Sequence, residues 1–334
     1  MRLRRSDLSG PGISRRRRGG GFSYRAPDGS GVSDADLDRI RALAIPPAWR
    51  DVWICPWANG HIQATGLDDA GRRQYLYHEE WRRRRDEQKY DRVLELAPGL
   101  PGFRRRVQRQ LSGRGWPRER TLAVALRMLD HGVFRTGGEN YAEENGTYGV
   151  ATLLRSQVSV SGTRVAFAYV AKGGLDRELV LDDGPLARAV AGLKRVRSES
   201  DQLLVYRAAH GVRPVRSEDL NSRFQELVGD RYSVKDLRTW NATVLAAAAL
   251  AGQPEPRSAR SARKAEAAVL REVAEHLGNT PAVARKSYVD PRLFDLYEHD
   301  RTIRPALQRI GSTDLASATV RPRVERAVLD LLAD

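Results

Sequence analysis

Five segments of the chain each carry one side chain that is suited to phosphoryl transfer. The candidate residues are Arg135, Lys172, Arg238, Asn279 and Tyr288. The planar guanidinium of arginine matches phosphate oxygens in a bidentate contact, and lysine and asparagine side chains donate further hydrogen bonds. Together, these residue types indicate chemistry at a phosphate group.

Three of the candidates stand where local sequence predicts the start, end or interior of a regular element. Arg135 follows the apolar positions of residues 119–131, which predict a mostly buried helix. Lys172 begins a Lys-Gly-Gly turn between two β-like segments, from which a long side chain can reach outward. Arg238 lies within a helix predicted over residues 233–251.

The last two candidates flank a predicted helix start. Asn279 precedes Thr280-Pro281, where threonine can cap the helix and proline fits its first turn. We expect this helix to carry Tyr288 and to end at Asp290-Pro291.

Each candidate also has an ordinary structural explanation. An arginine near a helix end is usually an ion-pair partner in solvent, and a lysine on a hairpin turn usually contributes only solubility. A tyrosine late in a helix commonly packs its ring and leaves its hydroxyl in water. The order of the five segments along the chain, rather than any one of them, distinguishes function from structure.

The composition favours a polyanionic partner. The chain has 334 residues, with 57 Lys+Arg against 42 Asp+Glu and a formal charge of +15. This length suggests two domains, and such a basic excess is typical of nucleic-acid-binding proteins. A ribosomal, RNA-binding or membrane-surface protein would satisfy the charge equally well.

Other classes of site find little support in the sequence. Cys55 is the only cysteine, which excludes an intrachain disulfide and a zinc finger. The six histidines show no paired ligand spacing, and Gly137-Gly138 lacks the Lys-Ser/Thr of a phosphate-binding P-loop. We therefore expect no metal and no cofactor. No apolar run approaches the ~20 residues that span a bilayer, so a cytoplasmic protein is expected.

The pattern along the chain predicts an α+β protein in three parts. Residues 1–21 carry seven arginines and are interpreted as a basic flexible tail, which DNA could order. Residues 22–88 read as a small β-rich domain, with Ser33 capping a short helix and Asn59-Gly60 marking a hairpin turn. Residues 89–334 read as a larger, mainly helical domain that contains a β-hairpin.

The five segments, in this order, resemble the catalytic motifs of type IB DNA topoisomerases of the compact poxvirus and bacterial kind. Resemblance extends to Ile45-Pro46-Pro47-Ala48-Trp49 and to residues 71–78, which look like the strand that faces the DNA major groove in that family. It covers most of residues 22–300. On this strand the candidates for DNA contact are Arg72, Arg73, Tyr75 and Tyr77, of which the last three alternate onto one face.

The resemblance implies a protein that relaxes supercoiled duplex DNA without ATP or metal. Tyr288 would attack the scissile phosphate and form a 3′-phosphotyrosyl intermediate. Arg135 and Arg238 would neutralise charge on the nonbridging oxygens, and Lys172 would protonate the departing 5′-oxygen. The two domains would form a clamp around DNA. The protein would act as a monomer and be associated with the nucleoid.

One residue departs from the family pattern. Many members have histidine where Asn279 stands here, and an amide donates hydrogen bonds but carries no proton. Asn279 therefore suits transition-state stabilisation rather than acid or base catalysis. His276 lies one helical turn earlier and is a possible substitute, although a structural or solvent-facing role is favoured.

Two rival interpretations remain at this stage. A tyrosine recombinase or integrase resembles the same catalytic domain, but usually carries a helical DNA-binding domain in place of the β-rich one. A noncatalytic architectural protein would use the same basic surface to bind DNA.

Overall fold

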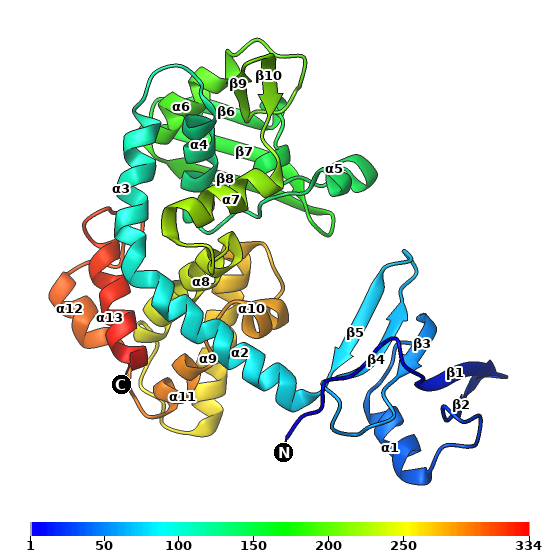
Figure 1. Ribbon diagram of the computed structural model, residues 1–334. Helices are drawn as coiled ribbons and strands as arrows, with labels where there is room; N and C mark the ends of the chain where they lie inside the picture. The colour runs from blue at the N-terminus through cyan, green and yellow to red at the C-terminus, as the bar shows by residue number, and fades with distance from the viewer. Residues whose placement is uncertain (1, 334) are drawn as a thin grey trace. The chain divides into compact units, whose positions relative to one another are not determined.

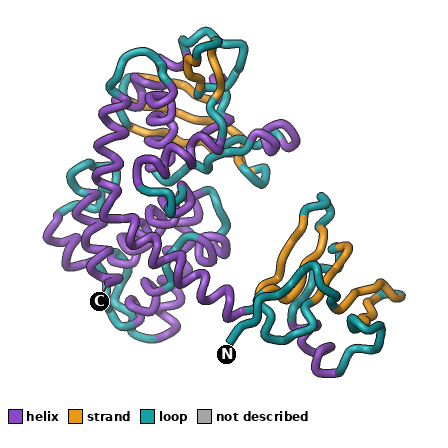
Figure 2. The backbone as a smooth tube through the Cα atoms, viewed as in Figure 1, coloured by secondary structure: helices purple, strands orange, loops and turns teal. Residues whose placement is uncertain are grey.

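The computed structural model describes residues 2–333, except for the side chains of residues 140, 141 and 143. The chain divides into two compact units, residues 1–89 and residues 90–334. Strands dominate the first unit and helices the second (Figure 2). The mixed α+β fold class predicted from the sequence is confirmed.

The first unit is built on a five-stranded antiparallel sheet in the order β2-β1-β3-β4-β5 (Figure 1). The strands are β1 (Ile13–Arg18), β2 (Gly21–Arg25), β3 (Arg50–Ile54), β4 (Ile62–Leu67) and β5 (Arg73–Tyr77). Helix α1 (Asp34–Ala42) begins at Ser33, whose side chain accepts from the Asp36 amide as predicted. Ile40 of this helix and Ile13 and Ile54 of the sheet form a small core.

The N-terminal arginines differ from the expected flexible tail. Residues 13–18 form β1, which pairs with both β2 and β3. The Arg15 guanidinium donates to the carbonyls of Pro46 and Trp49, at 3.1 and 2.6 Å, and lies over the Phe22 ring. The flexible tail was predicted from the high density of arginines. An arginine that binds carbonyl acceptors and an aromatic face can instead stabilise a strand.

The turn predicted at Asn59-Gly60 is also more elaborate than a two-residue hairpin. β3 and β4 are joined by residues 55–61, and the backbone of Arg4 pairs with Asn59 and His61 on this loop. The loop therefore serves as a binding surface for the N-terminal segment, which a local turn signal does not reveal.

The second unit is mainly helical. Its helices are α3 (Leu100–Leu111), α4 (Arg118–Asp130), α5 (Glu139–Asn145), α6 (Gly184–Lys194), α7 (Ser217–Val228), α8 (Val234–Ala251), α9 (Ala259–Leu277), α10 (Pro281–Ser287), α11 (Arg292–Glu298), α12 (Arg304–Ile310) and α13 (Arg321–Ala333). Helix α2 (Glu79–Leu96) begins in the first unit and ends in the second. Within residues 2–333, no helix combines the length and apolarity that crossing a membrane requires.

Two small sheets complete the second unit. β6 (Val158–Ser161), β7 (Arg164–Ala171) and β8 (Leu175–Asp182) form one, and β9 (Val205–Ala208) and β10 (Gly211–Pro214) form the other. β8 is an edge strand, and the β7–β8 hairpin carries the predicted turn at residues 172–174.

Helices α4 and α8 form the centre of the second unit. Leu122 to Leu126 of α4 are all fully buried, as is Trp240 of α8. Alanines on α8, such as Ala246 and Ala247, let neighbouring helices approach closely. The last turn of α4, the first half of α8 and the end of α9 meet around the candidate site.

Candidate active site

A cavity of about 440 Å³ in the second unit brings four of the five candidate residues together. Arg135, Lys172, Arg238 and Tyr288 all line it, although they come from four different segments. The fifth candidate, Asn279, contacts Arg135 directly. The structure thus gathers all five residues that the sequence singled out.

Arg238 is buried on α8, and three backbone carbonyls hold its guanidinium. Its Nη1 donates to Gly132 at 2.9 Å and to Phe134, and its Nη2 donates to Leu277. Burial lowers the pKa of Arg238 to about 10, with the Tyr288 hydroxyl opposing the shift and Arg135 adding to it. Because these carbonyls are neutral, a full positive charge remains at the cavity wall at neutral pH.

Arg135 and Asn279 orient each other. The Arg135 Nη2 donates to the Asn279 side-chain oxygen and approaches the Gly278 carbonyl at 3.5 Å. A guanidinium can only donate, so the amide oxygen must face it and the amide NH2 must point elsewhere. That NH2 is buried and has no hydrogen-bond partner among the described residues. It is therefore a donor held ready for an acceptor that the chain does not supply.

The turn between α9 and α10 places Asn279. Gly278 ends α9 in the left-handed conformation, with φ 62°. The backbone N–H of Asn279 then donates to the Ala274 carbonyl at 2.8 Å. Thr280 then caps α10 through the Val283 amide, with Pro281 in the first turn, as the sequence predicted.

Tyr288 lies one residue beyond α10 rather than on it. The helix ends at Ser287, and Tyr288 leaves helical geometry with φ −130°. Its carbonyl accepts from the Thr243 hydroxyl at 3.3 Å, and its half-buried ring packs beside the core. The Arg238 guanidinium carbon lies 5.3 Å from the centre of that ring. The aromatic group is therefore fixed next to the buried positive charge.

Lys172 stands at the tip of the β7–β8 hairpin, as predicted. Gly173 and Gly174 complete the turn with φ 89° and 73°, values that favour glycine. The Gly174 amide donates to Ala171 at 3.1 Å, and on the adjoining strand the Val170 carbonyl accepts from Tyr148 at 2.8 Å. Residues before the tip are anchored, and the lysine extends to the cavity.

The loop that carries Arg135 depends on a glycine pair that sequence reasoning missed. The Val150 and Ala151 amides donate to Arg135 and Thr136 at 2.9 and 2.8 Å. This pairing brings Gly149 against Gly137, so that a Cβ on Gly149 would lie 2.4 Å from the Gly137 nitrogen. A Cβ on Gly137 would likewise lie 2.9 Å from the Gly149 Cα, so both glycines are needed for the close packing of the two loops.

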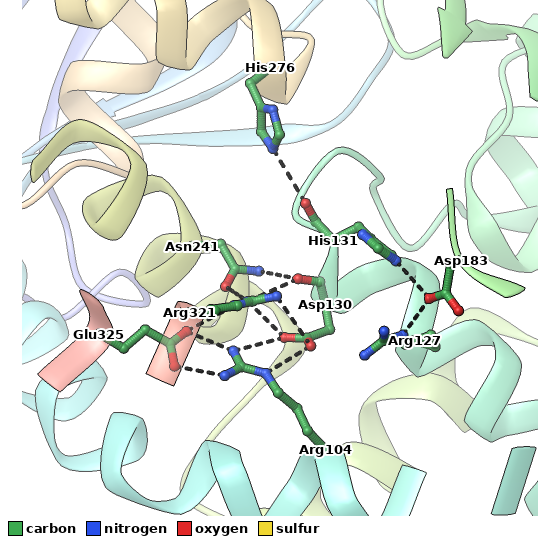
Figure 3. A network of polar contacts seen from close by, with 9 residues as sticks. All are labelled: Arg104, Arg127, Asp130, His131, Asp183, Asn241, His276, Arg321 and Glu325. Atoms are coloured by element: carbon green, nitrogen blue, oxygen red, sulfur yellow. Dashed lines mark hydrogen bonds and ion pairs between the residues drawn. The ribbon is translucent and has the colours of Figure 1, made fainter. Parts of the chain in front are cut away.

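A buried ionic network supports the end of α4, just before this loop (Figure 3). The Asp130 carboxylate accepts from Arg104 at 2.9 Å and from Arg321 at 3.0 Å, and Glu325 pairs with both arginines. Asn241 on α8 bridges the Asp130 carbonyl and Arg321. Burial alone would raise the pKa of Asp130, but Arg321 and Arg104 hold it well below its usual range. The sequence signal for this network is an acidic residue, Asp130, at the end of the apolar stretch of α4.

His276 does not take the place of Asn279. Its exposed ring turns toward α4, where Nε2 lies 3.3 Å from the His131 carbonyl, as Figure 3 shows. His131 in turn contacts Asp183, the residue that caps α6. His276 thus connects the ends of α9 and α4, which agrees with the favoured structural role.

In the first unit, the candidate DNA-contact residues share one edge of the sheet. The rings of Tyr75 and Tyr77 stack with centres 6.0 Å apart, and Leu76 turns to the core. Arg73 is exposed beside them, and Arg72 forms an ion pair with Asp68 at 2.9 Å. The stacked Tyr75 and Tyr77 rings and the inward Leu76 agree with the predicted alternation along this strand, while contact with DNA stays a prediction.

No group of three or more His, Cys, Asp or Glu side chains that could hold a metal ion occurs in the part of the chain that the structure describes. The cavity instead concentrates cationic and neutral donors around a tyrosine hydroxyl. This arrangement suits an anion and a nucleophilic oxygen.

Known proteins resemble the chain along most of its length. The family described as "Eukaryotic DNA topoisomerase I, catalytic core" matches residues 78–309, and the "Bacterial DNA topoisomerase IB, N-terminal domain" matches residues 21–68. The chain is 28% identical to the DNA topoisomerase 1B of Acanthamoeba polyphaga mimivirus over 298 residues, or 86% of this chain and 88% of the relative. It is 24% identical to that of vaccinia virus (strain Copenhagen) over 243 residues, or 70% and 71%.

Proposed function

The chain belongs to the type IB DNA topoisomerases, and from this premise we propose that it relaxes supercoiled duplex DNA by transient nicking through Tyr288. The Tyr288 oxygen attacks the scissile phosphorus, the bond to the 5′-oxygen breaks, and a 3′-phosphotyrosyl link forms. Reversal of the same step reseals the strand after rotation. The link conserves the energy of the phosphodiester, so the cycle consumes no ATP.

The observation that carries this proposal is the state of the two arginines beside Tyr288. Arg135 and Arg238 are held by carbonyl and amide oxygens, which fix their position but leave their charge uncompensated. Preorganised donors of this kind stabilise charge that develops on phosphate oxygens in the transition state. We propose that the pair neutralises the two nonbridging oxygens and takes the place that a metal ion has in other phosphoryl-transfer sites.

Lys172 and Asn279 complete the proposed reaction. The 5′-oxygen is a poor leaving group until it is protonated, and Lys172 reaches the cavity from the hairpin tip to supply that proton. The orphan NH2 of Asn279 donates to a phosphate oxygen, which satisfies a buried polar group only when substrate is bound.

We further propose that the first unit, which includes β1 and ends at residue 89, is a DNA-binding domain, and that residues 90–334 are the catalytic domain of a monomer that binds double-stranded DNA through both. Arg72, Arg73, Tyr75 and Tyr77 would meet the duplex in the first domain. A cytoplasmic, nucleoid-associated location follows from this substrate.

The decisive experiment traps the covalent intermediate. Supercoiled plasmid is incubated with the protein in excess EDTA and without ATP, and the reaction is stopped with denaturant. We expect relaxed topoisomers and a protein–DNA adduct whose cross-linked peptide contains Tyr288. Absence of any adduct would favour an architectural protein, and paired strand exchange in a tetramer would favour a recombinase. Complete loss of relaxation in EDTA would refute the metal-free cycle.

A further inference from the structure

Arg177 on β8 is bound to the end of helix α9. Its Nη1 donates to the Glu275 carbonyl at 2.9 Å, and its Nη2 donates to the His276 carbonyl at 3.0 Å. Both carbonyls belong to the last turn of α9, where backbone acceptors lack partners within the helix. This one side chain thus links the edge strand of the hairpin to a helix about a hundred residues away in sequence.

The same helix end binds three arginines in succession. Arg177 takes the carbonyls of residues 275 and 276, Arg238 takes that of residue 277, and Arg135 approaches that of residue 278. The negative end of the helix dipole favours guanidinium groups at this point. Because the three arginines come from a strand, a helix and a loop, the end of α9 serves as their common reference.

This geometry bears on Lys172 through the hairpin. Arg177 pairs across the hairpin with Tyr169, and Lys172 directly follows Ala171, the last paired residue of β7. A Cβ built on Gly173 or Gly174 would meet nothing within 4 Å, so these two glycines of the tip do not pack on other parts of the chain. The direction of the tip therefore depends on anchors further down the two strands.

Two such anchors hold the strands in different ways. On β7, the Val170 carbonyl accepts from the Tyr148 amide, and the Tyr169 ring stacks on Phe134 at 6.2 Å. β8 is an edge strand whose outer side has no neighbouring strand in this sheet. Arg177 provides its attachment to α9, and Gly278 makes room for it, since a Cβ there would lie 3.2 Å from the guanidinium.

We propose that Arg177 is a positioning residue that aligns the Lys172 hairpin with the end of α9, and thereby with Arg238 and Asn279. In this proposal Arg177 acts through Lys172, because both of its terminal nitrogens donate to backbone carbonyls of α9. The inference rests on the proposed role of Lys172 as the general acid.

The test compares Arg177→Ala with Lys172→Ala on two substrates. One is ordinary DNA, and the other carries sulfur in place of the bridging 5′-oxygen, which leaves as a thiolate and hardly needs a proton. We expect Lys172→Ala to cleave ordinary DNA ~10²–10⁴-fold more slowly, the usual range for a positioned proton donor. We expect Arg177→Ala to lose about 10–100-fold, since a misplaced catalytic group costs rate in this range. Both variants should recover on the sulfur substrate.

A double variant and two controls make the result specific. Arg177→Ala combined with Lys172→Ala should cleave no more slowly than Lys172→Ala alone, because the positioned group is already absent. Arg164→Ala removes the same charge from the opposite end of the hairpin, where Arg164 is exposed and pairs with Asp182, and should cleave at the wild-type rate. Arg177→Lys, which retains one donor, should fall between wild type and Arg177→Ala.

The outcomes separate the two hypotheses. If sulfur fails to rescue Lys172→Ala, the acid assignment is wrong, whatever Arg177 does. If sulfur rescues Lys172→Ala but leaves Arg177→Ala equally slow on both substrates, the positioning inference is overturned. A wild-type rate for Arg177→Ala on ordinary DNA overturns it as well. If Arg177→Ala does not fold, Arg177→Lys is judged by the same rescue.

Discussion

Two buried regions of the second unit hold arginines by opposite means. Around Asp130, Arg104 and Arg321 are paired with two carboxylates, so the cluster of four side chains is neutral. Around the cavity, the guanidinium of Arg238 is held by three neutral backbone carbonyls. Burial alone would lower the pKa of Arg104, but Asp130 and Glu325 raise it above its ordinary value. The same burial lowers the pKa of Arg238, and carbonyl partners do not reverse the shift.

The difference separates a structural arginine from a functional one. A carboxylate partner neutralises the charge of a guanidinium. A carbonyl partner fixes the position of the group but leaves its charge available to a ligand. Burying an uncompensated charge destabilises a fold, so such a site indicates that an anion completes it. In this chain the proposed anion is the DNA phosphate, and the network around Asp130 supports the helix end that leads to it.

The largest effect on chemistry should come from the nucleophile beside the uncompensated arginines. Tyr288→Phe removes only a hydroxyl, so we expect nicking and adduct formation to be abolished. Noncovalent DNA binding should be nearly unchanged, because the cationic groups remain. Gel assays under denaturing and native conditions measure the two properties. Tyr297 is the matched control, since its hydroxyl donates to the Pro254 carbonyl away from the cavity, and an adduct mapped there would refute the assignment.

Two variants, one from each buried region, test the distinction between structural and functional arginines. Arg238→Ala should reduce cleavage ~10²–10³-fold, as expected for one lost transition-state donor. Arg104→Ala leaves Asp130 and Glu325 to share Arg321 alone, one positive charge for two carboxylates, and should lower the free energy of unfolding by about 3–5 kcal/mol, the range for a broken buried pair. Cleavage rates of folded protein and denaturant midpoints provide the two measurements. If each variant changed rate and stability in equal proportion, the division between structural and functional arginines would be wrong.

Substitution of Asn279 can change Arg135 from an arginine held by neutral oxygens into one that is paired with a carboxylate. Asn279→Ala should slow cleavage by about 10–100-fold, the rate factor that corresponds to the free energy of one hydrogen bond to a charged group. Asn279→Asp places a carboxylate on Arg135 and gives it the compensated state of Arg104. We therefore expect a further loss of rate together with a higher unfolding midpoint. Faster cleavage by Asn279→Asp than by Asn279→Ala would show that charge compensation at Arg135 is harmless.

Features of the site that follow local sequence signals could be predicted from the sequence, whereas contacts between residues far apart in the chain could not. The five site residues follow local signals, such as the Thr280-Pro281 helix start and the turn at Lys172, and their order supported a family. The partners that hold them do not follow local signals. Asp130 meets Arg321 across 191 residues, and the guanidinium of Arg177 meets carbonyls of α9, which every residue type supplies. The prediction of a flexible tail for the β1 arginines failed for a related reason, because composition does not show which arginines find hydrogen-bond acceptors.

The smallest effects are expected on the first unit, where a third kind of arginine is exposed on the sheet. Arg72 shares its charge with Asp68, whereas Arg73 lies on the face with Tyr75 and Tyr77. Each phosphate contact releases counterions, so removing one contact should reduce the slope of log affinity against log salt by about 1. We expect Arg73→Ala to show this reduction and Arg72→Ala, the matched neighbour, to show less of it.

Binding titrations over a range of salt concentrations, with Tyr288→Phe as the background, measure these slopes without cleavage. In the same assay, Tyr75→Ala should weaken affinity at every salt concentration and leave the slope unchanged, because an aromatic ring carries no charge to neutralise a phosphate. Equal slopes for Arg72→Ala and Arg73→Ala would mean that pairing with Asp68 does not withhold charge from DNA. The rule drawn from Arg104 and Arg238 would then apply only to buried arginines, where low polarity strengthens each pairing.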